Sequence, residues 1–228
     1  MPKPILDIKN YHNDFLILKS KDPSYLAKIG KSIFGRKLDF VEEVIVTPIE
    51  ICLKLNRLFE ESKIELLQKI EKGETNKFIT YQLPIYFNDH EDWENVRSTT
   101  GFSKEGIIEK LVVTKFSISM FGFLPGFIYL EGLDPSLHVP RKKTPSKYVK
   151  ANSIALGGKY VGLYSIDSPG GWHVVGQIPI SILDIPQLPP VEMNLGDQIK
   201  LHPIDQIEFK NILQKQMSLT AYNNSFPK

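Results

Sequence analysis

Glycine and proline are concentrated, together with aromatic and basic residues, between positions 121 and 172 of this 228-residue sequence. Three stretches there could form a site, and they read FGFLPGFIYL over 121–130, PRKKTP over 140–145 and SPGGW over 168–172. Pro169 fixes one φ angle, and the Gly170-Gly171 pair after it permits positive φ. The sequence therefore predicts a tight turn whose bare N–H groups point toward an anionic or carbonyl oxygen.

A basic segment supplies the second half of this candidate site. The guanidinium of Arg141 is a planar fork that suits a carboxylate or a phosphate, and Lys142 and Lys143 beside it raise the local positive potential. The whole chain is nearly neutral, with 28 Lys and Arg against 26 Asp and Glu, so this cluster departs from the average charge. A solvated loop is the plainer interpretation of such a run, and it stays open.

Aromatic side chains complete the candidate site. Phe127, Tyr129, Tyr164 and Trp172 could form a wall for a small ring or for the side chain of a partner protein. Aromatic residues at strand spacing are also typical of a protein core, and a Pro-Gly-Gly segment is often only a turn. Composition and spacing alone leave the function open.

Several classes of protein are disfavoured by the composition. A net charge of +2 gives no strong field for nucleic acid or for anionic lipid. The sequence has no Walker A, GxGxxG, HExxH, GxSxG or paired CxxC motif, and its five histidines are scattered around one cysteine, Cys52, so a zinc site is not expected. The lone cysteine and the lack of an apolar segment in MPKPILDIKN lead us to expect a cytoplasmic protein. No membrane span is expected, because the only long apolar stretch, 111–130, carries Lys115 and is interrupted by Gly122, Pro125 and Gly126.

The elements that must position these residues fall into two parts, which we expect at 1–80 and 81–228, with the junction near Gly73–Asn76. The first part predicts a small α/β domain of order ββαββα. Its first helix begins at Asp22-Pro23 and ends at Gly35, with Tyr25, Leu26, Ile29, Ile33 and Phe34 on one face. Its strands are expected at Pro4–Lys9, Asp14–Leu18, Val41–Val46 and Ile49–Leu55, and its second helix carries Ile64, Leu67 and Ile70.

The second part is expected to be rich in strands. After a strand over Phe78–Phe87 we expect two helices, the first capped by Asp89 with Trp93 and Val96 buried, the second capped by Ser103 with Ile107, Ile108 and Leu111 buried. Further strands are expected at Lys115–Phe121, Ser153–Leu156, Tyr160–Tyr164, Trp172–Gln177 and Gln198–His202. Many short strands between turn signals predict a β-barrel rather than a doubly wound sheet.

Four blocks of this part together resemble one known family. GFLPGFIYL, PRKKTP, NSIALGGKYVGLYS and SPGGWHVVGQIP follow the order and spacing of GFxPGFxYL, PRxxxPR, GSVxIxGxxxGxYP and SPGGWxxxGRTP. These blocks are typical of the family of the 5-oxoprolinase B subunit, also called the allophanate hydrolase subunit 1, sporulation-kinase inhibitor or carboxyltransferase subdomain C/D family. The resemblance implies an α+β protein in which a small N-terminal α/β domain precedes a cyclophilin-like β-barrel.

The resemblance also implies partners and chemistry. Proteins that this chain resembles act with a homologous C subunit and a lactam-utilisation A subunit, and the assembled complex opens 5-oxo-L-proline to L-glutamate at the expense of ATP. No metal site can be read in this chain. Two alternatives share the same blocks and stay open: a protein that inhibits a sensor histidine kinase by binding to it, and a subunit of an allophanate- or urea-type amide hydrolase.

Site residues follow from the resemblance position by position. It assigns Arg141, Gly170 and Gly171 to catalysis, with Arg141 as an anion clamp and the two glycine backbones as donors that face the reacting oxygen. The residues that it assigns to substrate binding are Gly126, Phe127, Tyr129, Pro145, Gly158, Tyr164, Ser168, Pro169 and Trp172.

The chain departs from the family pattern at three positions. Ser146 stands where the second Arg of PRxxxPR is usual, Gln177 where the Arg of GRTP is usual, and Leu111 where a histidine often precedes the first glycine-phenylalanine pair. Lys147 is the nearest candidate to replace one missing charge, although Lys lacks the bidentate geometry of Arg. Either the substrate differs from that of the family, or these positions belong to a partner interface.

Overall fold

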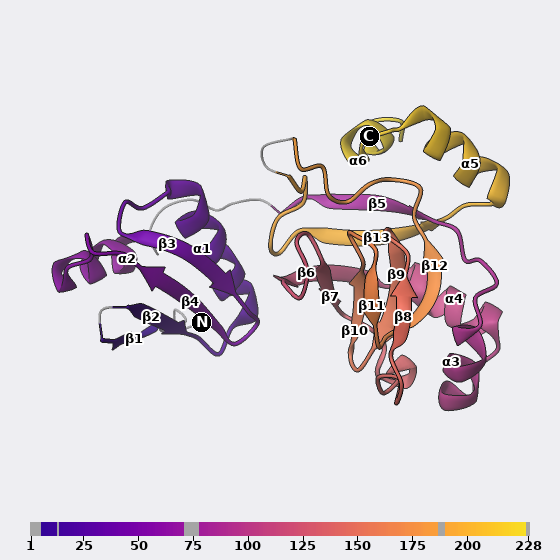
Figure 1. The fold of residues 1–228 in the computed structure, drawn as a ribbon, viewed down its shortest axis with the longest axis horizontal. Coiled ribbons are helices and arrows are strands. Elements are labelled where there is room, and N and C mark those ends of the chain that lie inside the picture. Colours follow the sequence, from indigo (N-terminus) through magenta and orange to yellow (C-terminus); the bar gives the residue numbers. More distant parts are fainter. Residues whose placement is uncertain (1–5, 13, 71–77, 187–189, 227–228) are drawn as a thin grey trace. The chain divides into compact units, whose positions relative to one another are not determined.

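The chain forms two compact units in the computed structural model (Figure 1), which describes residues 6–12, 14–70, 78–186 and 190–226. The first unit comprises Met1–Phe78 with Ser119–Phe121, and the second comprises Ile79–Ile118 with Gly122–Lys228. The predicted junction at Gly73–Asn76 lies outside the described residues. Each unit is described by itself below.

The first unit is a four-stranded antiparallel sheet with helix α1 packed on one face. Its elements follow the predicted ββαββα order, and the strands lie side by side as β1-β2-β4-β3. Their bounds are β1 Asp7–Tyr11, β2 Phe15–Lys19, β3 Val41–Val46 and β4 Glu50–Leu55. Alternate residues such as Leu16, Leu18, Ile51 and Leu53 are fully buried, which is the period expected of a sheet with one covered face.

Helix α1 spans Pro23–Arg36 and begins as predicted, because the Asp22 side chain accepts a hydrogen bond from the Tyr25 N–H at 3.1 Å. The predicted end at Gly35 is wrong. The helix continues to Arg36 and ends where Lys37 adopts a left-handed conformation with φ 46°. Phe34 is also not on the buried face: it is 69% exposed, since the face that packs on the sheet is set by Leu26, Ile29 and Ile33.

A short 3₁₀ turn, η1 Glu61–Lys63, leads into helix α2 Ile64–Ile70. Leu67 and Ile70 are buried as predicted, whereas Ile64 is only half-buried.

The second unit is built on a curled seven-stranded sheet with the order β12-β9-β10-β7-β6-β13-β5 (Figure 1). The strands are β5 Thr80–Ile85, β6 Lys115–Phe121, β7 Ile128–Glu131, β9 Ser153–Gly157, β10 Tyr160–Leu163, β12 His173–Gln177 and β13 Gln198–Pro203. The predicted hairpin is formed by β9 and β10, and Gly158 in its turn has φ 60°. Strands β13 and β5 run parallel. The protein is therefore a mixed α+β fold.

The two edges of this sheet meet at one β-bridge. Tyr86, directly after β5, and Gln177, at the end of β12, exchange two backbone hydrogen bonds of 2.9 Å each. Gly176 permits this approach, because a Cβ there would lie 2.9 Å from the Tyr86 carbonyl oxygen and 2.9 Å from the Ile85 side chain. The sheet thus curls into a half-barrel whose edges are joined by this bridge.

Two helices, α3 Asp92–Thr100 and α4 Lys104–Val113, precede β6. Ser103 caps α4 as predicted and accepts a hydrogen bond from the Gly106 N–H at 3.1 Å. Asp89 does not cap α3. The helix begins three residues later, at Asp92, and Glu91 before it makes no side-chain cap. The Asp89 carboxylate instead forms an ion pair with Lys104 at 2.5 Å. The predicted buried residues Trp93, Val96, Ile107 and Leu111 are buried, but Ile108 is only half-buried.

Several elements were not predicted from the sequence. They are η1 Glu61–Lys63, strand β7 Ile128–Glu131, η2 Pro135–Leu137, the two-stranded sheet of β8 Ser146–Val149 and β11 Ser168–Gly170, and helices α5 Gln206–Lys215 and α6 Leu219–Asn223. Helix α6 covers part of the free side of β5, where the Asn223 amide bonds both backbone groups of Gln82 at 2.7 and 3.1 Å. Among the described residues, no helix is long and apolar enough to cross a membrane.

Candidate functional site

The segments singled out from the sequence meet on one side of the curled sheet. The Lys142 N–H donates to the Gly171 carbonyl oxygen at 2.7 Å, which joins the basic loop to the SPGGW segment. The Gly158 N–H donates to the Val139 carbonyl oxygen at 2.7 Å, which joins the same loop to the β9–β10 turn. A Cβ on Gly171 would lie 3.8 Å from the Pro145 ring. Blocks far apart in the sequence are therefore neighbours in space.

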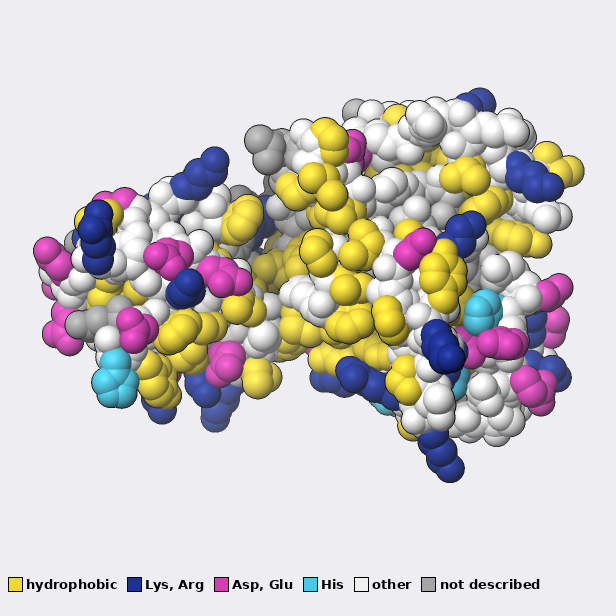
Figure 2. All heavy atoms as spheres, viewed as in Figure 1, with side chains coloured by type: hydrophobic (Ala, Val, Ile, Leu, Met, Phe, Trp, Pro, Cys, Tyr) yellow, Lys and Arg dark blue, Asp and Glu magenta, His cyan; other side chains and the backbone are white. Residues whose placement is uncertain are grey.

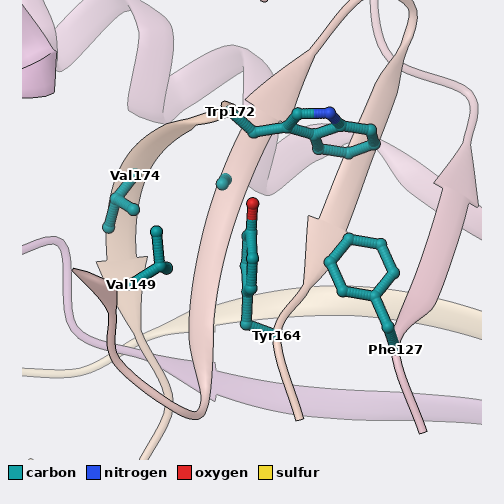
Figure 3. Close-up of a cluster of buried hydrophobic side chains, with 6 residues drawn as sticks. Phe127, Val149, Tyr164, Trp172 and Val174 are labelled. Atoms are coloured by element: carbon teal, nitrogen blue, oxygen red, sulfur yellow. The ribbon is translucent and has the colours of Figure 1, made fainter. Parts of the chain in front are cut away.

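The aromatic residues form a continuous cluster centred on Phe127 (Figure 3). The Phe127 ring lies edge-on to those of Tyr129, Tyr164 and Trp172, with centroid distances of 4.8, 4.9 and 5.8 Å. Phe127, Tyr164 and Trp172 are buried. Of the four predicted residues, Tyr129 is half-buried and reaches the surface, as does Tyr160 at 5.8 Å from it. The predicted wall is therefore mostly core, with a tyrosine rim.

Glycines under the indole make this packing possible. A Cβ on Gly157 would overlap the Trp172 ring, and one on Gly162 would lie 2.6 Å from the same ring and 2.8 Å from Phe127. Two glycines on adjacent strands thus provide a flat surface on which Trp172 lies against the backbone of β9 and β10.

Arg141 is exposed, and its guanidinium carbon lies 5.8 Å from the centre of the Trp172 ring. Burial raises the pKa of Tyr129, and the positive charge of Arg141 acts against that rise. The guanidinium therefore stands at the rim of the aromatic cluster, next to Tyr129 and open to solvent. This is a position from which it can bind an anion.

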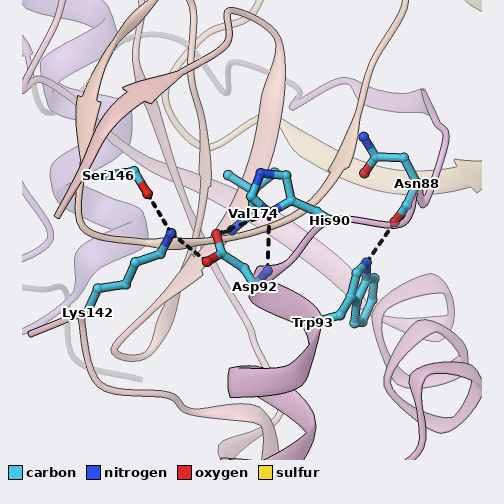
Figure 4. Close-up of polar contacts among 7 residues, drawn as sticks. All are labelled: Asn88, His90, Asp92, Trp93, Lys142, Ser146 and Val174. Carbon is cyan, nitrogen blue, oxygen red and sulfur yellow. Dashed lines mark hydrogen bonds and ion pairs between the residues drawn. The ribbon is translucent and has the colours of Figure 1, made fainter. Parts of the chain in front are cut away.

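Lys142 does not add to the positive potential as the sequence suggested. Its ammonium forms an ion pair with Asp92 at 2.5 Å and donates to Ser146 Oγ at 2.8 Å (Figure 4). The Asp92 and Lys142 side chains are only 3% and 9% exposed. The second carboxylate oxygen of Asp92 accepts a hydrogen bond from the Val174 N–H at 2.8 Å. Asp92 is not among the site residues expected from the sequence, and this pair was missed because nothing local links positions 92 and 142.

The SPGGW segment differs from the predicted tight turn. Ser168–Gly170 forms strand β11, in which Ser168 pairs with Val149 and Gly170 with Ser146, and neither Gly170 nor Gly171 has a positive φ. Glycine is needed at 170 for another reason, namely that a Cβ there would overlap the Tyr164 hydroxyl. Pro169 is exposed.

Tyr164 links this segment to the aromatic cluster. Burial raises the pKa of Tyr164 to about 12, and the backbone N–H of Trp172 acts against that rise. Ser168 is 8% exposed, and its Oγ has no hydrogen-bond partner within the described parts of the chain.

The first glycine-rich loop contributes one residue that the sequence did not single out. Phe123 has φ 71°, is 63% exposed, and lies edge-on to Phe127 at 5.4 Å. A positive φ is unfavourable for a bulky residue, so the loop holds Phe123 in a strained backbone conformation. Gly126, with φ 72°, packs against Leu183 and Ser165. The glycines on either side of Phe123 were the only sequence signal for this arrangement.

The three departures from the family pattern have structural roles. Ser146 bonds the Lys142 ammonium, Gln177 forms the bridge that joins the sheet edges, and Leu111 is fully buried in α4. Lys147 is exposed on β8, so the cation that approaches Ser146 is Lys142. In the described ranges, no group of three or more His, Cys, Asp or Glu side chains could hold a metal ion.

Comparison with known proteins gives matches over most of the chain. Residues 35–193 match the family described as carboxyltransferase domain, subdomain C and D. The B subunit of 5-oxoprolinase from Haemophilus influenzae is 28% identical over 180 residues, which are 73% of this chain and 83% of that protein. The B subunit of 5-oxoprolinase from Escherichia coli O157:H7 is 30% identical over 152 residues, which are 66% of each chain.

Two further matches are to parts of longer proteins. The urea amidolyase of Lachancea kluyveri is 33% identical over 95 residues, which cover 38% of this chain and 5% of that protein. The crystal structure of TTHA0988 matches with a TM-score of 0.72 and 21% identity, over 89% of this chain and 40% of that one. The latter match concerns the fold alone.

Proposed function

Because the chain belongs to the family of the carboxyltransferase domain, subdomain C and D, we propose that it is the B subunit of an ATP-dependent 5-oxoprolinase. The observation that carries the proposal is its similarity, over 73% and 66% of its length, to two proteins named as the B subunit of 5-oxoprolinase. In this proposal the chain acts in the cytoplasm with a homologous C subunit and a lactam-utilisation A subunit, and its curled sheet is a cyclophilin-like barrel.

The proposed reaction opens 5-oxo-L-proline to L-glutamate. A lactam carbonyl resists water, so ATP transfers a phosphoryl group to its oxygen and leaves as ADP. Water then adds to the carbon, and the C–N bond breaks as the nitrogen takes up a proton. A second water hydrolyses the resulting acyl phosphate, which releases phosphate and leaves the new carboxylate of L-glutamate. Arg141 binds the substrate carboxylate or the new phosphate, and the backbone N–H groups of Gly170 and Gly171 face the reacting oxygen. The Tyr129 rim and the neighbouring Pro145 and Gly158 bound the space around the ring.

The proposed partners need a surface on which to bind. Figure 2 shows hydrophobic side chains gathered over the strands of the second unit on the face that it displays. Phe123, Tyr148 and Ile185 of this unit are each more than 60% exposed. This exposure supports an assembly in which other subunits cover part of the unit.

Reconstitution tests the function directly. The chain is mixed with its A and C subunits, and the release of phosphate from ATP and the formation of L-glutamate are measured with and without 5-oxo-L-proline. We expect phosphate release that depends on both the lactam and this chain. Omission of each component in turn is the control, and lactam-dependent turnover that persists without this chain would contradict the proposal.

A second candidate function rests on the urea amidolyase match. It is a subunit that acts on an allophanate- or urea-type amide, and it is tested by offering allophanate and urea in place of the lactam in the same assay. If no amide supports turnover and the chain instead binds a dimeric sensor kinase domain and blocks its autophosphorylation, then the kinase-inhibitor alternative replaces both proposals.

A further inference from the structure

A buried ion pair fastens the basic loop to helix α3 and strand β12. We propose that this pair, Asp92 with Lys142, positions the guanidinium of Arg141 over Trp172, so that Asp92 and Lys142 are positioning residues of the candidate site. The inference rests on the proposed function because it takes Arg141 to be the group that contacts the substrate.

The burial of the pair excludes direct contact with a ligand. The two side chains are 3% and 9% exposed, and both carboxylate oxygens of Asp92 already have partners. The Lys142 ammonium contacts one oxygen. The other oxygen is contacted by the Val174 N–H, two residues beyond Trp172 in the chain, and by His90 Nδ1 at 3.4 Å. Asp92 therefore connects the loop that carries Arg141 with the strand that follows Trp172.

Lys142 is held at both of its ends. Its backbone N–H donates to the Gly171 carbonyl oxygen at 2.7 Å, and its ammonium contacts Asp92 and Ser146 (Figure 4). With Lys142 fixed inward, the preceding residue has little freedom, and Arg141 lies on the solvent side with its guanidinium 5.8 Å from the Trp172 ring. A long side chain with several rotatable bonds would otherwise sample many positions.

A buried ion pair is an inefficient way to gain stability. The cost of removing two charges from water offsets most of their attraction, and an apolar pair of the same shape often stabilises a protein as well or better. The pair Asp89–Lys104 is equally short at 2.5 Å but has a fully exposed carboxylate. The Asp92–Lys142 pair differs from it in joining three segments around Arg141, which is what a positioning role requires.

Fluorine NMR tests the positioning without any need for activity. The chain is labelled with 5-fluorotryptophan, Trp93→Phe assigns the two resonances, and Arg141→Ala gives the Trp172 resonance in the absence of the guanidinium. We expect the neutral double variant Asp92→Asn/Lys142→Met to move the Trp172 resonance most of the way to its position in Arg141→Ala. Asp89→Asn is the matched control and should leave it in place. An unmoved resonance in a folded double variant would overturn the proposal.

If the double variant does not fold, a single isosteric variant provides the same test. Asp92→Asn keeps an acceptor for the Val174 N–H and frees Lys142 to turn toward solvent, so the same shift of the Trp172 resonance is expected with a native circular dichroism spectrum. The resonance staying at its native position in this variant would equally contradict the positioning role.

Kinetics on the assembled complex provide a second measurement. We expect the double variant to lower kcat/KM about 10- to 100-fold, the usual cost of a misplaced substrate-binding group. In an Arg141→Ala background the same double substitution should cause little further loss, because both act through one guanidinium. An additive loss would show that the pair acts independently of Arg141. If the native complex has no lactam-dependent activity, the proposed function is wrong. The NMR measurement still tests whether the ion pair positions Arg141, because it does not need activity.

Discussion

The phenol of Tyr164 lies against the Cα of Gly170, in the space that any side chain at position 170 would occupy. The backbone N–H of Trp172 acts against the rise that burial causes in the pKa of the same phenol, so one side chain interacts with two residues of the SPGGW segment. Glycine at this position is thus a packing requirement set by a tyrosine from a different block. The two blocks form one structural unit.

Replacing Gly170 with Ala should destabilise the protein by about 1–3 kcal/mol, because the added methyl group overlaps the Tyr164 hydroxyl and one of them must move. Gly171→Ala is the matched control, since its nearest neighbour would be Pro145 at 3.8 Å. Urea denaturation of both variants measures the difference. Equal stability of the two variants would contradict this account of the motif.

Tyr164→Phe should change how stability depends on alkaline pH. The pKa of Tyr164 is about 12 in the folded protein against 10.0 ordinarily, so the unfolded chain ionises first and stability is lost as the pH rises from 10 to 12. The variant has no such hydroxyl and lacks this loss. We expect the gap in free energy of unfolding between the native protein and the variant to change by about 1.4 kcal/mol in the variant's favour between pH 8 and pH 11, measured by denaturant titration. A constant gap would contradict the raised pKa.

Arg141→Ala should abolish the activity of the reconstituted complex while the Tm of the isolated chain stays within a few degrees of native. The side chain is exposed, and its contact with Trp172 contributes only about 0.5–1 kcal/mol. The exposed neighbour Lys143 is the control, and Lys143→Ala should retain activity. A misfolded Arg141→Ala chain, or a fully active one, would refute the clamp.

Gly176→Ala should open the contact between the sheet edges. A methyl group there would lie 2.9 Å from the Tyr86 carbonyl oxygen, so the bridge between Tyr86 and Gln177 must lengthen. Hydrogen exchange at the Tyr86 and Gln177 amides is expected to accelerate, with smaller effects at β10. Gly35→Ala is a contrasting control: nothing lies within 4 Å and the residue is helical, so it should stabilise by about 0.5–1 kcal/mol.

Local signals in the sequence predicted the first unit and most strands of the second. Asp22-Pro23 and Ser103 mark helix starts because the capping chemistry involves only residues within three positions. The Gly157-Gly158-Lys159 turn predicts a hairpin for a similar reason, since a tight turn needs a residue that tolerates positive φ. These features depend on neighbours in the chain and can be read one segment at a time.

The relationships that shape the site could not be read in this way. Asp92 and Lys142 are paired across fifty positions, and Asp89 resembles a cap but bonds Lys104 instead. The strands β8 and β11 are short and gain their identity only by pairing with each other. Gly170 resembled a turn residue because nothing in its vicinity reveals that Tyr164 lies against it. Tertiary packing, rather than local propensity, decided each of these.

The order of strands in the curled sheet has a consequence for synthesis on the ribosome. Strand β13, residues 198–203, lies between β6 and β5 and bonds to both, although both are made about eighty or more residues earlier. Until β13 has left the exit tunnel, β5 and β6 have a vacant place between them, and each presents an unpaired edge. The unit can therefore complete its sheet only after residue 203 has emerged from the ribosome, and a nascent chain stalled before residue 198 would be a natural client for chaperones that recognise open strands.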